Sequence, residues 1–374
     1  MKERLVRFSH RNLNPFGVAK FHTPKPLYFA IAVTRRCISR CVMCSSWKAT
    51  PGREPTYHDV RHIFSNPVLD QLEGVNFIGG EPTLRKDLAR LARGILEVNP
   101  NIKQLGMITN GLETESVERR LHEIFSLPMI SDLRQMAVSV SLDGYGETHD
   151  KIRRVPNAFK RVDKTIRSLL KLRDTYPFSV NLICTIQKIN IGGLDRLKDY
   201  ARNLGLHVFY NPVAHLSISS EVFEEKVKPT VAQLAELKDF IFNRANVSRY
   251  DRAFWNDYFK LMKGKKRTFP CAAPYYFLKM KPEGNLYMCG NGDHGVYGNV
   301  FEREIDKIWY SARAQEIRSL QKKDYCGSCN IANKPEISLR SHPAHFAAFL
   351  LREKFLFHFS SLSNRLKRYS PTSR

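Results

Sequence analysis

The sequence predicts an α/β fold in which six strands alternate with helices. Short apolar runs recur along residues 27–213, and stretches with apolar residues at helical spacing separate them. Cysteines, glycines and polar side chains follow directly after several of these runs. Such alternation is typical of parallel βαβ units, and barrel-like folds place their functional groups at the carboxyl ends of the strands. By itself, the alternation is compatible with an open barrel and with a doubly wound sheet.

The first apolar run, residues 27–33, leads into a loop with three cysteines, Cys37, Cys41 and Cys44. Three residues and then two residues separate them. A loop at the end of a strand can bring all three sulfurs to one metal centre. Three thiolates are one fewer than a closed four-cysteine site, and in iron–sulfur chemistry this leaves one iron open to an outside ligand. The spacing alone also allows a zinc site or three unrelated cysteines.

The second strand is predicted to end in Gly79, Gly80, Glu81 and Pro82. Two glycines at the end of a strand allow the backbone to approach a ligand closely. A carboxylate at that place can accept hydrogen bonds from an ammonium group. As a bare tetrapeptide, this segment is also compatible with an ordinary turn from a strand to a helix.

Periodicity places the other elements. Strands are expected at 75–78, 105–109, 136–142, 179–186 and 206–213. Helices are expected at 56–72, 113–125, 159–176 and 194–203, with one more beginning at Thr83. Thr56 is the expected N-cap of the first helix. Cys184, on an apolar strand, is expected to be a buried small hydrophobe.

Ser141 lies at the end of the fourth predicted strand, and Arg153 follows it in a polar segment. Arginine suits the binding of a carboxylate, because its planar guanidinium matches the two oxygens. A surface cation is the simpler interpretation of an arginine, and we apply it to Arg154.

A second set of cysteines lies towards the end of the chain, after two charged helices expected in residues 220–265. It consists of Cys271, Cys289, Cys326 and Cys329. A turn at residues 281–285 predicts a β-hairpin between the first two, and a helix is expected near 304–320. Four thiolates can close a structural zinc site or ligate a 4Fe-4S cluster fully.

The cysteine loop, the Gly79–Pro82 turn and the segment from Ser141 to Arg153 resemble motifs of the radical S-adenosylmethionine (SAM) superfamily. The resemblance implies that Cys37, Cys41 and Cys44 ligate a catalytic 4Fe-4S cluster. It implies that SAM is bound through its amino group by Gly79, Gly80 and Glu81, and through its carboxylate by Ser141 and Arg153. It also places residues 109–111 near the ribose and residues 211–213 beside the adenine. One departure is Met43, because the residue before the third cysteine is often aromatic in the family.

The resemblance implies a partial (β/α)6 TIM-like barrel followed by a small α+β domain of the SPASM or twitch type. The second set of cysteines resembles the shorter twitch form, with one auxiliary 4Fe-4S cluster, while zinc remains the alternative. The expected divisions are a basic segment 1–26, a barrel 27–215, a helical linker 216–265, the auxiliary domain 266–335 and a basic amphipathic tail 336–374.

The implied function is that of a radical SAM enzyme, either an oxidoreductase or a peptide-modifying enzyme. One electron cleaves SAM, and the resulting 5′-deoxyadenosyl radical takes hydrogen from an unactivated carbon. A peptide, a sugar or aminocyclitol, and a lipid-linked molecule are the candidate substrates, with flavodoxin or ferredoxin as electron donor. The sequence identifies no catalytic acid or base, and it leaves net oxidation and epimerisation both open.

The net charge of +24 indicates anionic partners without identifying them. The aromatic and basic C-terminal tail predicts either peripheral membrane association or packing on the barrel. Cysteines with metal-type spacings in a long chain indicate a reducing compartment, so we expect a cytoplasmic location. If the tail associates with a membrane, that location is peripheral at the inner face of the membrane. No recognisable motif supports nucleic-acid binding. The alternative function is a non-catalytic metal-binding protein that associates with RNA or an anionic membrane surface.

Overall fold

The computed structural model describes residues 23–48, 50, 52–213, 221, 223–268, 271–287 and 295–319. Its strands form one sheet in the order β6-β5-β4-β3-β2-β1-β7-β8-β9. Cys289, Cys326, Cys329, nearly all of the basic segment 1–26 and the whole C-terminal tail lie outside the described residues.

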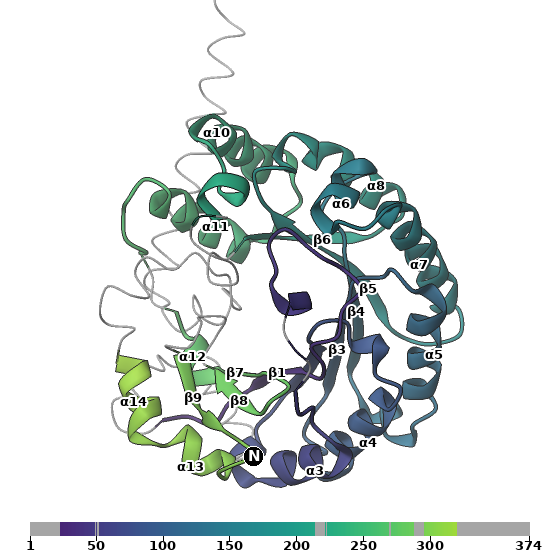
Figure 1. Cartoon of the computed structure of the whole chain (residues 1–374), viewed down its shortest axis with the longest axis vertical. Coiled ribbons are helices and arrows are strands. Elements are labelled where there is room, and N and C mark those ends of the chain that lie inside the picture. Colours follow the sequence, from purple (N-terminus) through teal and green to yellow (C-terminus); the bar gives the residue numbers. More distant parts are fainter. Residues whose placement is uncertain are drawn as a thin grey trace, which may run out of the picture.

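The first six strands are parallel, and each neighbours the next one in sequence. They are β1 (Tyr28–Ala32), β2 (Gly74–Ile78), β3 (Gln104–Thr109), β4 (Gln135–Ser141), β5 (Ser179–Ile186) and β6 (His207–Pro212). A doubly wound sheet reverses its strand order at a switch point, and no such reversal occurs among these strands. The sheet curves without closing, so the fold is the predicted partial barrel (Figure 1).

Helices cover the outer side of this curved sheet (Figure 1). They are α3 (Tyr57–Ser65), α4 (Leu88–Val98), α5 (Thr114–Phe125), α6 (Glu147–Arg153), α7 (Ala158–Leu172) and α8 (Leu194–Asn203). Short 3₁₀ helices lie in the connecting segments: η1 (Ser46–Lys48), η2 (Pro67–Leu69), η3 (Pro82–Leu84), η4 (Pro128–Asp132) and η5 (Ile191–Gly193).

Several predicted helix boundaries need correction: α7 ends at Leu172 and not at 176, and the helix expected near 304–320 is divided into two, 305–309 and 312–319. Thr56 caps α3 through a capping box with Asp59, as expected, but α3 ends at Ser65 because Asn66 and Pro67 start a new 3₁₀ turn. The prediction that Thr83 begins a helix was wrong. Thr83 lies within η3, and α4 starts at Leu88.

The chain beyond β6 continues with helices and then returns to the sheet. The helical part contains the π-helices η7 (Phe223–Val227) and η8 (Phe240–Arg244), with α10 (Val231–Asp239), α11 (Arg249–Leu261) and α12 (Ala273–Tyr276). The last strands and helices are β7 (Phe277–Met280), β8 (Asn285–Tyr287), β9 (Val296–Asn299), α13 (Ile305–Trp309) and α14 (Ala312–Ser319).

β7 and β8 form the predicted antiparallel hairpin, and β7 also pairs in parallel with β1. Gly284 has a φ of +89° in the hairpin turn, where a side chain would collide with Asn299 and Phe301. Glu283 of the same turn forms an ion pair with Arg35, which follows β1. The hairpin is therefore tied to the segment that leads into the cysteine loop.

The two faces of the barrel sheet differ in chemistry. Side chains that face the helices form the apolar core; Phe29, Phe77, Val138 and Leu182 are examples. None of the nine described strands contains Asp or Glu. Acidic groups of the described barrel therefore lie in the helices, in the loops and just beyond the ends of the strands.

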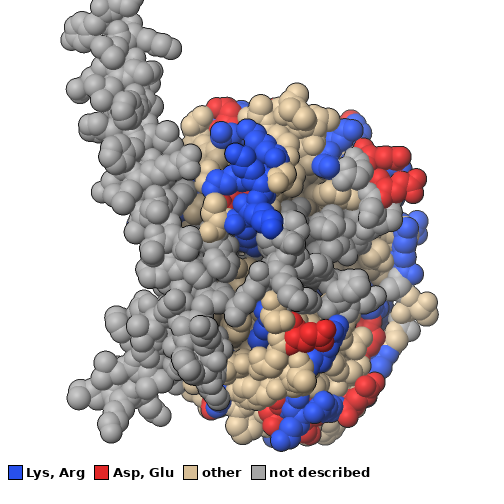
Figure 2. Space-filling view, turned by 90° about the vertical axis from the view of Figure 1, so that its left-hand side faces the viewer, with Lys and Arg blue, Asp and Glu red and all other residues tan. Residues whose placement is uncertain are grey.

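Figure 2 shows a patch of lysine and arginine side chains on the face in view, with acidic and basic side chains mixed elsewhere on that face. This distribution agrees with the net charge of +24. Among the described residues, no helix has both the length and the apolar character that a membrane span requires.

Candidate iron–sulfur and SAM site

The cysteine loop lies between β1 and α3 and is attached to the end of α6. The backbone N–H of Arg40 donates to the Arg153 carbonyl (3.1 Å), and that of Val42 donates to the Ile152 carbonyl (3.0 Å). These two hydrogen bonds flank Cys41 on both sides. The loop's conformation is therefore set by α6, a helix that the periodicity of the sequence did not reveal.

The structure brings an N–H donor to each of the three predicted thiols. The donors are Asn110 Nδ2 at Cys37 Sγ (3.7 Å), Arg153 Nη1 at Cys41 Sγ (3.5 Å) and the backbone N–H of Ser46 at Cys44 Sγ (3.4 Å). Hydrogen bonds of this kind stabilise thiolates and are found around the sulfurs of iron–sulfur centres. The donor set therefore fits a cluster held by these three cysteines.

Burial also affects the thiols themselves. It raises the pKa of Cys37 to about 11, and it raises the pKa of Cys41 above its usual value. Metal binding requires the thiolate, so a cationic iron centre would have to offset this cost. Within the described part of the chain, no three His, Cys, Asp or Glu side chains are grouped as a site for a single metal ion.

The two predicted glycines allow a close approach, but the nearby group is the protein's own backbone. A side chain on Gly79 would collide with the Thr34 carbonyl, and one on Gly80 would collide with the carbonyls of Arg35 and Arg36. Gly80 N–H donates to the Thr34 carbonyl at 2.7 Å. The glycines thus hold the end of β2 against the start of the cysteine loop.

Glu81 follows these glycines and is 1% exposed. Its Oε1 accepts hydrogen bonds from the Thr83 backbone N–H (3.2 Å), the Thr83 hydroxyl (2.8 Å) and the Thr109 hydroxyl (2.8 Å). Its Oε2 accepts the Asn110 backbone N–H at 2.6 Å. Burial raises the pKa of Glu81, and these hydrogen bonds act in the opposite direction. The carboxylate joins the ends of β2 and β3.

Arg153, the last residue of α6, is buried beside the cysteine loop. Its Nη2 forms an ion pair with Asp143 Oδ2 at 2.8 Å, while its Nε has no hydrogen-bond partner within the described residues. Ser141, the other residue predicted to meet the SAM carboxylate, is half-buried at the end of β4. The buried Nε–H of Arg153, which has no partner within the described residues, is suited to a ligand carboxylate near the end of β4.

Met43 lies next to an apolar cluster of Val42, Val213 and Val227. The structure thus brings Met43 to the residue that follows β6, where the resemblance places the adenine. A thioether is polarizable and packs well against a ring.

Two residues near the thiols have contacts that the sequence does not predict: the resemblance places Asn110 near the ribose, and it gives Asp143 no role. Asn110 contacts Cys37 and binds Glu81, and Asp143 pairs with Arg153. Both lie in segments that the sequence had marked as strand ends. Their polar type was the available signal, but Asn110 lies 73 residues from Cys37, and Arg153 follows Asp143 on a helix that the periodicity does not reveal.

Of the second cysteine set, only Cys271 is among the described residues, where it is half-buried. Cys184 is completely buried on β5 within the apolar core, as predicted.

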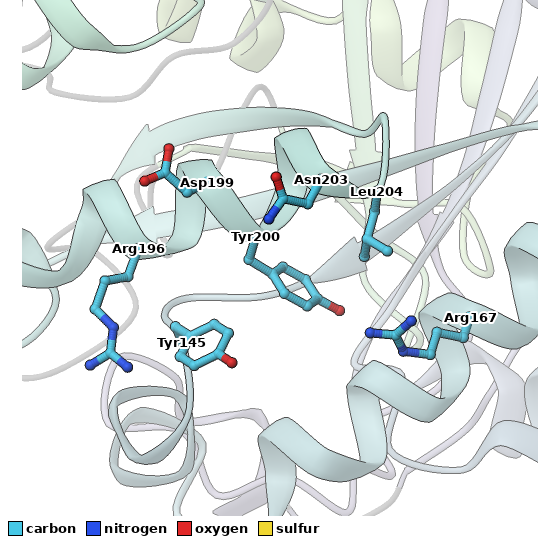
Figure 3. Close-up of a pocket in the computed structure, with 7 residues that line it drawn as sticks. All are labelled: Tyr145, Arg167, Arg196, Asp199, Tyr200, Asn203 and Leu204. Carbon is cyan, nitrogen blue, oxygen red and sulfur yellow. The ribbon is translucent and has the colours of Figure 1, made fainter.

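A pocket on the outer surface is separate from the cysteine loop. It is lined by Tyr145, Arg167, Arg196, Asp199, Tyr200, Asn203 and Leu204 (Figure 3). Two of these side chains already have a partner in Asp163, which accepts a hydrogen bond from the Tyr200 hydroxyl at 2.7 Å and forms an ion pair with Arg167 at 3.0 Å. None of the predicted site residues lines this pocket.

The fold and the loop define an iron–sulfur protein of the open-barrel α/β class. The model of the radical SAM superfamily matches residues 31–201, and that of the SPASM iron–sulfur cluster-binding domain matches residues 271–330. The chain belongs to the radical SAM superfamily and carries a SPASM domain. It is accordingly a radical SAM enzyme whose cofactors are SAM, a 4Fe-4S cluster and auxiliary iron–sulfur.

The mycofactocin maturase MftC of Mycobacterium tuberculosis is 27% identical over 81% of this chain and 75% of its own length. The AdoMet-dependent heme synthase of Methanosarcina barkeri is 25% identical over 82% of this chain and 89% of its own.

Solved structures agree on the fold. The structure of anSMEcpe with bound AdoMet has a TM-score of 0.60 at 16% identity and covers 91% of this chain and 99% of its own. Streptococcus suis SuiB bound to precursor peptide SuiA has a TM-score of 0.59 at 17% identity, covering 84% of this chain and 72% of its own.

Proposed function

We propose that this enzyme modifies a peptide at an unactivated carbon. The observation that carries this proposal is the chemistry of the inner barrel face. The inner positions of β2, β4, β5 and β6 include partly exposed amide and hydroxyl side chains: Asn76, Ser139, Asn181, Thr185 and Asn211. An amide both donates and accepts hydrogen bonds, which matches the alternating N–H and C=O groups of a peptide backbone.

The register places several inner residues in two rows across the strands. Ser139 pairs with Asn181, and Asn181 pairs with His207 on β6. Thr185 is likewise paired with Asn211. Small or polar residues at these positions leave room inside the sheet, whereas large apolar residues fill the interior of a closed barrel.

The relatives support a peptide substrate. The similar MftC is a maturase, and SuiB has been solved with a precursor peptide on the same fold. The heme synthase relative supports a second candidate, a haem precursor. The described strands offer few positive charges to this second substrate, because His207 on β6 and Lys279 on β7 are the only basic residues in them.

In this proposal, Cys37, Cys41 and Cys44 hold the catalytic cluster. When bound, the cluster and SAM supply a carbon-centred radical that removes the hydrogen atom. The Gly79–Glu81 segment meets the amino group of SAM, and the Glu81 carboxylate holds that segment in shape. Ser141 and Arg153 bind the carboxylate of SAM, for which the unused Nε of Arg153 is suited.

The auxiliary domain is proposed to ligate a second 4Fe-4S cluster through Cys271, Cys289, Cys326 and Cys329. That cluster would accept an electron from the substrate, which favours net oxidation over epimerisation. The domain limits given above stay predictions. A flavodoxin or ferredoxin is the proposed electron donor, and a donor with an acidic surface would suit the basic patch in Figure 2.

The first test measures iron, sulfide and 5′-deoxyadenosine in anaerobically reconstituted protein with SAM and dithionite. We expect about eight irons in the wild type and about four in the Cys37→Ala/Cys41→Ala/Cys44→Ala variant, with 5′-deoxyadenosine from the wild type alone. Cys184→Ala is the matched control and should behave as the wild type. Zinc in place of iron, with intact SAM, would contradict the assignment and favour the non-catalytic alternative.

The second test addresses the substrate. The reduced enzyme is incubated with SAM and a library of synthetic peptides that are deuterated at one residue type in each pool. Deuterium transfer into 5′-deoxyadenosine is the expected result. Transfer from a deuterated haem precursor, with none from any peptide pool, would favour the second candidate.

A further inference from the structure

Arg153 lies closer to the cluster ligands than a residue that only binds SAM would need to be. Its Nη1 donates to Cys41 Sγ at 3.5 Å, and its own carbonyl accepts the Arg40 N–H at 3.1 Å. Side chain and backbone of the same residue thus hold both the sulfur and the loop around it.

The cation that reaches Cys41 has a fixed orientation. Asp143 is 0% exposed, and its Oδ2 pairs with Arg153 Nη2 at 2.8 Å. The Asp143 Oδ1 accepts the Thr185 backbone N–H at 2.8 Å, and the Asp143 N–H donates to His149 Nδ1 at 3.1 Å. Because Asp143 is held by β5 and α6, it directs the positive end of the ion pair towards the sulfur.

The geometry points to a redox role: Arg153, oriented by Asp143, is a positioning residue that raises the reduction potential of the cluster through its N–H contact with the Cys41 thiolate. This inference rests on the proposed ligation of the cluster by Cys41. Reduction places one added electron from an external donor, here dithionite, on the cluster and its sulfurs. A cation and an N–H donor at one sulfur stabilise that reduced state more than the oxidised state.

The inference assigns Arg153 two separate tasks. Nη1 acts on the cluster before SAM arrives, whereas the unpaired Nε remains for the SAM carboxylate. A residue that served SAM alone would leave the potential of the SAM-free cluster unchanged.

The test uses the reconstituted full-length protein and its Arg153→Gln and Arg153→Lys variants. EPR-monitored redox titration without SAM gives the midpoint potential of the cluster whose signal changes when SAM is later added. Equilibrium dialysis gives the Kd of SAM. We expect a lower midpoint potential in Arg153→Gln and a smaller decrease in Arg153→Lys, which keeps the charge but loses the planar fork.

Arg154→Gln is the matched control. Arg154 is the neighbouring arginine and is exposed, so this variant loses the same charge without losing the contact with Cys41. Its midpoint potential should equal that of the wild type. Weaker SAM binding with an unchanged SAM-free potential in both Arg153 variants would overturn the inference. A wild type with no SAM-responsive EPR signal would instead overturn the proposed function itself.

Discussion

Two buried carboxylates stand at the carboxyl ends of barrel strands, and they are stabilised in different ways. Glu81, after β2, accepts four hydrogen bonds from neutral groups of Thr83, Thr109 and Asn110. Asp143, after β4, faces the charged Arg153 and one backbone N–H. Both are at most 1% exposed.

The two carboxylates therefore have different tasks at the same end of the barrel. Neutral donors hold Glu81 without bringing a second charge into the site, so Glu81 works as a joint between β2 and β3. Asp143 compensates a buried cation whose other nitrogen reaches Cys41. Glu81 therefore fixes the backbone at the ends of β2 and β3, whereas Asp143 and Arg153, after β4 and on α6, place an ion pair beside Cys41.

The largest effect should come from removing the charge of Asp143. Asp143→Asn leaves Arg153 as an unpaired buried cation, which should lower the free energy of unfolding by about 3–5 kcal/mol. The Asp143→Asn/Arg153→Gln double variant should recover part of this loss. Anaerobic urea denaturation followed by tryptophan fluorescence provides the measurement. Equal losses in the single and double variants would show that the ion pair is not the cause.

A smaller effect is expected at the neutral carboxylate site. Glu81→Gln turns one acceptor oxygen into an NH2 group that faces N–H or O–H donors, at a cost of about 1–3 kcal/mol in the same assay. Glu302→Gln, at an exposed glutamate, is the control and should be neutral. A variant as stable as the wild type would mean that the four hydrogen bonds are readily replaced.

The smallest effect depends on pH and concerns His149, which binds the Asp143 N–H. Burial lowers the pKa of His149 well below its usual value of 6.5, so below about pH 6.5 the unfolded chain binds a proton that the folded chain does not. Stability should therefore fall by about 1.4 kcal/mol per pH unit as the pH decreases through this range. His149→Asn, whose Oδ1 can accept the same N–H, should lack this contribution.

Denaturation midpoints of the wild type and the His149→Asn variant between pH 7 and pH 5 provide the comparison. Parallel pH profiles would show that His149 does not contribute. The variant keeps the hydrogen bond to Asp143, so a change in slope would report protonation and not the loss of that contact.

Most elements of the barrel were predictable from local pattern. The fifth strand and the helix after it match their predicted limits, 179–186 and 194–203, because their apolar spacing is regular. The helix α6 was not predicted, because its seven residues include one apolar side chain, Ile152, and so show no periodic stripe. The expected helix start at Thr83 is instead the short helix η3, in which the Thr83 hydroxyl donates to Glu81, the residue that caps it.

The sequence by itself determined the residue types of the predicted site and their order: three closely spaced thiols, then two glycines and a glutamate, then a serine and an arginine. These are local properties, since spacing along the chain and strand periodicity need no knowledge of distant residues. Only the tertiary structure decided which of these residues contact each other. Arg153 and Cys41 are 112 residues apart, and Thr109 and Glu81 are 28 apart. Parallel strands bring such distant segments to one edge of the sheet, and so the charge beside the cluster depends on the fold.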